Sequence, residues 1–105
     1  MATYIMLIKL SEEAAADITN AKSGRNAGKK AATALGVQWK RSYLLMGGDY
    51  DVLVVLEAPD EETMAKFALL GAMSGAVSTR TMRAFTETEA DELVRSLGEL
   101  TELVA

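Results

Sequence analysis

The chain has 105 residues, half of them apolar, which is enough for one folded domain with its own core and excludes a disordered chain. It contains no cysteine and no histidine, which excludes disulfides, thiol nucleophiles, histidine-based catalysis and the usual ligands of zinc and haem. We therefore expect no cofactor and no bound transition metal.

The formal net charge of −4 is unevenly distributed along the chain. Residues 22–41 contain six basic residues and no acidic one, whereas residues 87–102 contain six acidic residues and a single arginine. A basic block can bind an anion or a nucleic acid. Because the chain as a whole is acidic, we interpret the block as a solvated helix face followed by a strand edge that Lys40 and Arg41 protect from pairing with other chains. We expect no nucleic-acid partner.

The first predicted elements are a strand and a helix in two pieces. Residues 3–10 alternate in the manner of a strand, and both of its faces are mostly apolar, so we expect it to be covered on both sides. Ser11 is the predicted N-cap of the first helical piece. Ser23 is the predicted cap of a second piece that runs to Leu35, with Gly36 as its C-terminal stop.

A hairpin is predicted next. Its first strand covers residues 37–46, in which Trp39, Arg41 and Tyr43 share one face by alternation. Two glycines at 47–48 supply the positive-φ backbone that a tight hairpin needs. The β-branched run Val52–Leu56 that follows is typical of a central strand.

The second half repeats the pattern of helix and strand. Asp60 is the predicted cap of a helix, and residues 77–85 form a fourth strand with Arg80 and Arg83 on opposite faces. Thr86 and Glu89 have the spacing of a capping box for a last helix. The apolar positions of that helix are Leu93, Val94, Leu97 and Leu100.

The predicted order is β-α-β-β-α-β with a C-terminal helix appended, which is an α+β protein with a ferredoxin-like antiparallel sheet. Its helices can cover only one face of the sheet. The other face carries four apolar side chains, which cannot all stay wet: Ile5, Leu7, Leu53 and Val55. A second copy of the same sheet is the simplest cover, so we predict a homodimer or higher homo-oligomer.

The chain resembles the GYD family over nearly its whole length, as one GYD-like domain spanning 1–105. The residues that carry the resemblance are Gly48, Tyr50, Asp51, the run 57–60 (Glu-Ala-Pro-Asp), Gly71 and the run 81–85 (Thr-Met-Arg-Ala-Phe). The resemblance implies a dimeric α/β-barrel arrangement, in which two ferredoxin-like sheets pack face to face around a cavity. It implies no particular reaction.

Five residues are candidates for binding a ligand: Asp51, Lys9, Tyr50, Arg83 and Trp39. Strand order places Lys9 beside Asp51, either as a structural pair at a sheet end or as a pair that holds a polar ligand in the cavity. Tyr50 is either a core tyrosine or a ligand contact. Arg83 is either an anion anchor or an inert outward cation, and Trp39 is either packing or a stacking platform.

Three functions remain open. The first, which we favour, is a homo-oligomeric domain that binds a small anionic or partly apolar molecule in a cavity at the sheet face. The second is a cofactor-independent enzyme similar to the isomerases or monooxygenases of the barrel group, with Asp51 as its base. The third is an assembly module without a ligand. The sequence shows no signal peptide and no membrane span, so we expect a cytoplasmic protein.

Overall fold

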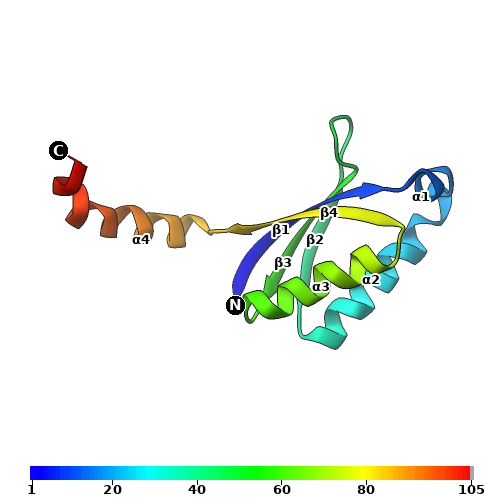
Figure 1. The fold of residues 1–105 in the computed structure, drawn as a ribbon, viewed down its shortest axis with the longest axis horizontal. Coiled ribbons are helices and arrows are strands. Elements are labelled where there is room, and N and C mark those ends of the chain that lie inside the picture. Colours follow the sequence, from blue (N-terminus) through cyan, green and yellow to red (C-terminus); the bar gives the residue numbers. More distant parts are fainter. Residues whose placement is uncertain (105) are drawn as a thin grey trace.

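The computed structural model describes residues 1–104, and Figure 1 shows its ribbon. The elements follow in this order: β1 (Ala2–Leu10), α1 (Glu12–Ala16), the short 3-10 helix η1 (Ile18–Asn20), α2 (Ala21–Leu35), β2 (Gln38–Leu44), β3 (Val52–Ala58), α3 (Glu61–Met73), β4 (Val77–Ala84), α4 (Glu87–Leu97) and the 3-10 segment η2 (Gly98–Val104).

The four strands form one antiparallel sheet in the order β2-β3-β1-β4, and α2 and α3 pack together on one side of it (Figure 1). The predicted ferredoxin-like arrangement is confirmed. The two central strands are β1 and β3, paired in a register that sets Ile5 opposite Val55 and Leu7 opposite Leu53. The outer strands are β2 and β4, which form the two opposite edges of the sheet.

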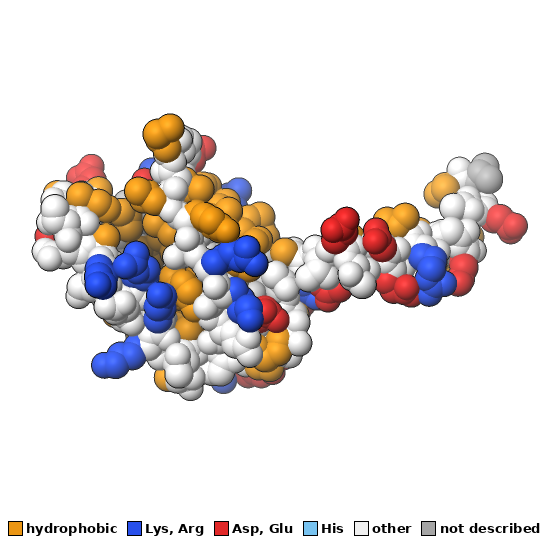
Figure 2. Space-filling model, turned by 180° about the vertical axis from the view of Figure 1, so that it is seen from behind, with side chains coloured by type: hydrophobic (Ala, Val, Ile, Leu, Met, Phe, Trp, Pro, Cys, Tyr) orange, Lys and Arg blue, Asp and Glu red, His pale blue; other side chains and the backbone are white. Residues whose placement is uncertain are grey.

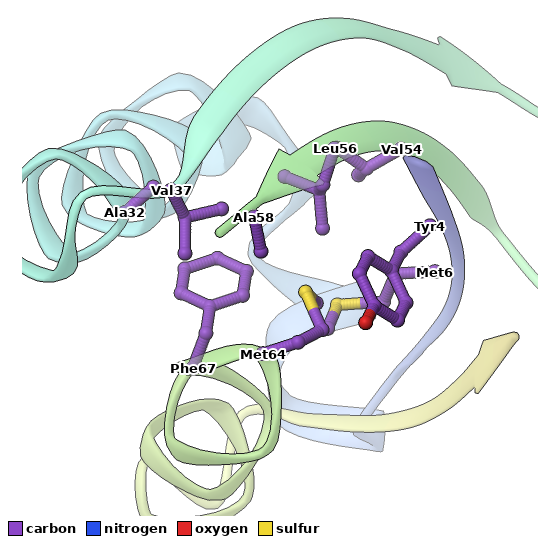
Figure 3. Close-up of a cluster of buried hydrophobic side chains, with 9 residues drawn as sticks. All are labelled: Tyr4, Met6, Ala32, Val37, Val54, Leu56, Ala58, Met64 and Phe67. Atoms are coloured by element: carbon purple, nitrogen blue, oxygen red, sulfur yellow. The ribbon is translucent and has the colours of Figure 1, made fainter. Parts of the chain in front are cut away.

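The core lies between the sheet and the two helices (Figure 3). Alternate residues of β1 and β3 point into it, and Val54 and Leu56 are completely buried. From the helix layer, Met64 and Phe67 of α3 and Ala32 of α2 close against them. Every second side chain of the strands points toward the helices, and the apolar side chains of α3 recur at helical spacing on the side that faces the sheet. Together they bury one face of the sheet.

The predicted caps at Ser11, Asp60 and Gly36 are confirmed, as is the capping box at Thr86. The Ser11 hydroxyl accepts a hydrogen bond from the Ala14 amide at 3.1 Å, and the Asp60 carboxylate accepts one from the Thr63 amide at 2.8 Å. That amide of Thr63 is the main reason why the pKa of Asp60 lies below its usual value. Gly36 ends α2 with a φ of 79°, a left-handed conformation that glycine adopts without steric cost.

The predicted cap at Ser23 is wrong, because α2 begins at Ala21 and Ser23 lies inside it. The chain turns earlier, through η1, so the Ser-Gly pair at 23–24 is carried within a continuous helix. Gly24 has open space around its Cα. An exposed helical glycine costs only about 1 kcal/mol relative to alanine, which packing of the rest of α2 can offset.

A bulge in β2 overturns the predicted common face of Trp39 and Arg41. The pairing register shifts between these two residues, so Trp39 lies opposite Leu56 on the helix side and Arg41 lies opposite Val55 on the other side. The ring of Trp39 packs under α2 at Gly28, where an added Cβ would lie 3.2 Å from the indole. Glycine at this position therefore makes room for the tryptophan.

The C-terminal segments α4 and η2 extend away from the rest of the chain as an arm (Figure 1). The longest dimension of the protein is 55 Å and the radius of gyration is 16.6 Å. A compact chain of this length would have a radius of gyration of about 13 Å. The apolar positions of α4 are accordingly open to solvent, with Leu93 47% and Leu97 58% exposed.

Candidate functional site

The side of the sheet opposite α2 and α3, here called the helix-free face, is organised as two cross-strand rows. The first row runs across the sheet as Tyr43, Leu53, Leu7 and Arg80. The second runs as Arg41, Val55, Ile5 and Met82. Side chains in such rows lie about 5 Å apart, so the four central aliphatic residues form one apolar patch with an arginine at each opposite edge.

No element of residues 1–104 covers this patch (Figure 1). Its four central side chains are half-buried by their neighbours within the sheet, while Tyr43 is 50% and Met82 40% exposed at the edges. Two shallow concavities lie on α2 and α4, away from the helix-free face. One copy of the chain therefore presents a surface there rather than an enclosed pocket.

The two arginines of the helix-free face are exposed, and neither has an ion-pair partner among residues 1–104. Asp51 lies on the same face one pleat before Leu53, where the Leu10 amide donates to its carboxylate. The other carboxylate of this face is Glu57, one pleat beyond Val55. It already lies 3.3 Å from the Lys40 ammonium. Arg41 and Arg80 are thus left without a negative charge from their own strands.

Asp51 and Lys9 lie beside each other at one end of this face, as the strand order predicts. The Asp51 amide donates to the Ile8 carbonyl at 2.8 Å, and the Asp51 carboxylate accepts a hydrogen bond from the Leu10 amide at 2.8 Å. The ammonium of Lys9 donates to the Asp49 carbonyl at 3.4 Å, and within residues 1–104 it forms no ion pair with Asp51. Asp51 therefore fastens the end of β1 to β3.

Tyr50, the next candidate, is half-buried where the β2–β3 loop enters β3. The loop itself turns through Gly47 and Gly48, both with a φ of 89°, which confirms the positive-φ prediction for this pair. These torsion angles are open to glycine and rare for other residues.

Arg83 and Trp39 lie away from the helix-free face. Arg83 is opposite Tyr4 in the register, and its guanidinium lies 4.4 Å from the centre of the Phe85 ring. It donates to the Thr3 carbonyl at 3.2 Å and lies 3.8 Å from the Glu89 carboxylate. Trp39 is on the helix side, where the centre of its ring lies 5.9 Å from the Lys29 ammonium. The five candidates thus do not form one cluster, and their role in binding stays a prediction.

The arginines that do flank the apolar patch, Arg41 and Arg80, were missed as site residues. The sequence did indicate Arg80, because it lies three residues before Arg83 in the same strand. The two side chains must therefore lie on opposite faces of the sheet, and only one of them can be on the helix-free face. Arg41 gave no such signal, because its side depends on the bulge in β2.

Two further features bear on the expected partners. Within residues 1–104, each helix is too short or too polar to span a lipid bilayer. In the same part of the chain, histidine, cysteine, aspartate and glutamate side chains form no group of three that could hold a metal ion.

A four-stranded antiparallel sheet with two helices on one face defines this chain as an α+β protein of the ferredoxin-like class. The profile of the GYD domain matches residues 4–94, and the chain belongs to that family. It is similar to the crystal structure of TTHA0845 from Thermus thermophilus, with 24% sequence identity and a TM-score of 0.54. The match covers 82% of this chain and 95% of that one, and it shows the fold. No curated protein shows significant similarity to this chain.

Proposed function

We propose that this protein is a homo-oligomeric binding domain, in which a second copy covers the helix-free face and a small, partly apolar anion binds between the copies. The observation that carries the proposal is the apolar patch with unpaired arginines at opposite edges. The fold itself allows many functions, so this surface rather than the fold supports the proposal.

The apolar patch supports the assembly. Contiguous apolar surface on a monomer commonly marks a contact surface, and each square ångström removed from water contributes about 25 cal/mol. The same face on a second copy offers a matching patch, since a two-fold axis brings a surface against itself. Covering one copy with another would therefore stabilise both at once.

The arginines support an anionic ligand. If the helix-free faces of two copies meet, Arg41 and Arg80 lose water, and an unpaired buried charge is costly. The second copy brings the same two arginines and no free carboxylate of this face, because Glu57 is held by Lys40 and the Asp51 carboxylate is held by the Leu10 amide. A carboxylate, sulfonate or phosphate on a small apolar body would pair with them and fill the space over the patch.

Binding of anilinonaphthalene sulfonate, an apolar anion that fluoresces in apolar surroundings, tests the proposal. We expect a single class of sites, and we expect Arg41→Gln with Arg80→Gln to weaken binding at least tenfold, about 1.4 kcal/mol. A neutral dye, Nile red, should bind both proteins alike. The matched control is Arg25→Gln, which replaces an exposed arginine of α2 and should leave the affinity for both dyes unchanged.

Two results would contradict the proposal. One is unchanged sulfonate affinity in the double variant, which would leave the arginines without a role in binding. The other is a monodisperse monomer by sedimentation at micromolar concentration. A stable oligomer that binds neither dye would instead support an assembly module without a ligand.

A further inference from the structure

The arm, residues 86–104, carries an apolar surface and a strong negative charge. Leu93, Leu97, Leu100 and Leu103 are between 47% and 79% exposed. Six of its residues are acidic and one is basic. An isolated helix of the length of α4 is marginal in water, since most helical stability comes from packing of the apolar face. The arm therefore needs a surface to pack on.

Local contacts connect the start of the arm to β4. The Thr86 hydroxyl accepts a hydrogen bond from the Glu89 amide at 3.2 Å, while the Glu89 carboxylate accepts one from the Thr86 amide at 2.9 Å. Arg83 of β4 binds this capping box through Glu89 and stacks on Phe85. The arm leaves the end of β4 pointing away from its own sheet (Figure 1).

A surface of opposite charge lies along α2 and β2, here called the basic edge. Its exposed cations include Lys29, Lys30 and Arg41, and no acidic residue occurs between 22 and 41. Exposed apolar side chains accompany them, with Tyr43 50% and Leu44 78% exposed. The outer side of α2 is also hollowed into a shallow groove lined by Lys29, Lys30 and small residues, among them Ser23, Ala27 and Ala34. Figure 2 shows blue side chains gathered over the body and red ones along the arm.

The arm cannot reach the basic edge of its own chain. The strand that leads into the arm, β4, and the strand of the basic edge, β2, are opposite edges of the sheet, and the arm points outward. Two arms pairing with each other would bring twelve acidic residues together against two arginines. Like charges at such short range are unfavourable.

We propose that the arm of one copy docks on the basic edge of a second copy. The leucines of the arm cover the small residues of the groove and the exposed apolar side chains of β2, and its carboxylates face Lys29, Lys30 and Arg41. Each copy offers one arm and one basic edge, so a two-fold assembly satisfies both contacts reciprocally. The inference rests on the homo-oligomer of the proposed function but uses a different surface from the helix-free face, except for Arg41 and Tyr43 at the border.

A charge-swap experiment on the full chain tests the docking. The first variant reverses the charge of the arm with Asp91→Lys, Glu99→Lys and Glu102→Lys. The second reverses the charge of the basic edge with Lys29→Glu and Lys30→Glu. We expect each variant alone to associate at least tenfold more weakly than the unaltered protein, by sedimentation at low salt. Mixed in equal amounts, the two should form a mixed oligomer, detected by native mass spectrometry with one partner isotope-labelled.

The controls separate charge from position. Lys66→Glu reverses an exposed lysine of α3 and should leave association unchanged. Raising the salt concentration should weaken the contact in the unaltered protein, because screening shortens the range of exposed charges. Circular dichroism of each variant confirms that the body is folded.

The outcomes distinguish this inference from the proposed function. If both charge variants associate normally, or if their mixture gives no mixed oligomer, the docking of the arm is wrong. If Leu53→Asp on the helix-free face dissociates the protein while the charge variants do not, only the face-to-face contact stands. If the charge variants dissociate it while Leu53→Asp does not, the arm docks and the proposed face-to-face assembly fails.

Discussion

The two faces of the sheet are made by alternate residues of the same strands, yet they have different surroundings. Leu56 is completely buried under α3, while Leu53, three residues earlier in β3, is only partly buried on the helix-free face. Both are leucines of one central strand. The difference shows that burial in this chain depends on what packs over a face, and that the chain supplies its own cover for only one of the two.

Placing a charge on the helix-free face should have the largest effect on assembly. Leu53→Asp would put a carboxylate into the proposed contact, and we expect self-association to weaken at least about hundredfold, about 3 kcal/mol. Sedimentation across a concentration series measures it. In the isolated copy the new side chain remains partly in water, so the fold should persist by circular dichroism. Unaltered association would refute the proposed contact.

Truncation within the sealed face should have the largest effect on folding. We expect Leu56→Ala to lower the free energy of unfolding by about 2–5 kcal/mol, through lost burial and the cavity left behind. Leu53→Ala is the matched control on the other face, and its cost should grow with protein concentration as the second copy covers it. Denaturant titration at two concentrations checks both. Equal, concentration-independent losses would mean that the two faces are not different.

Substitutions at the end of β1 test whether the Asp51 carboxylate has a structural role or binds a ligand. Asp51→Ala leaves the Leu10 amide without its acceptor and should lower stability by about 1–3 kcal/mol. Asp51→Asn keeps a carbonyl oxygen and should cost less, and Lys9→Met should cost least. Melting temperature and sulfonate affinity should be measured on all three. Unchanged stability with tenfold weaker binding in Asp51→Asn would assign the residue to a ligand site instead.

The smallest expected effect concerns the arm. The pKa of Glu89 lies below its usual value, first because the Thr86 amide donates to its carboxylate and further because Arg83 is nearby. A lowered pKa in the folded state means that this contribution is present above the ordinary glutamate value, roughly 4.3, and is lost as the pH falls through the lowered one. We expect a small loss of helix signal in that acid range. Glu89→Gln, which cannot titrate, should show less of it.

Local features of the fold could be predicted from the sequence because their causes lie within a few residues. The caps at Ser11, Asp60 and Thr86 each satisfy an amide three residues ahead. Strand alternation is equally local, so the apolar second face of the sheet could be predicted as well. Together with the order of elements, these features were enough to predict the ferredoxin-like topology.

The candidate site was predicted less well, because its composition depends on pairing across the sheet. A bulge between Trp39 and Arg41 sends them to opposite sides, and nothing in the alternation of β2 reveals it. Strand order placed Lys9 beside Asp51, but the carboxylate accepts the Leu10 amide instead, since a fixed backbone donor at 2.8 Å needs no ordering of a long side chain.

By itself, then, the sequence determined the order of the elements, the caps at Ser11, Asp60 and Thr86, the absence of histidine and cysteine chemistry, and the separation of basic and acidic segments. Only the tertiary structure decided that Arg41 and Arg80, rather than Arg83 and Trp39, border the helix-free face. It also decided that the acidic segment projects from the sheet while the basic segment forms the opposite edge. Charge and hydrophobicity are properties of residues, but which of them share a surface depends on register, bulges and the direction in which the chain leaves its last strand.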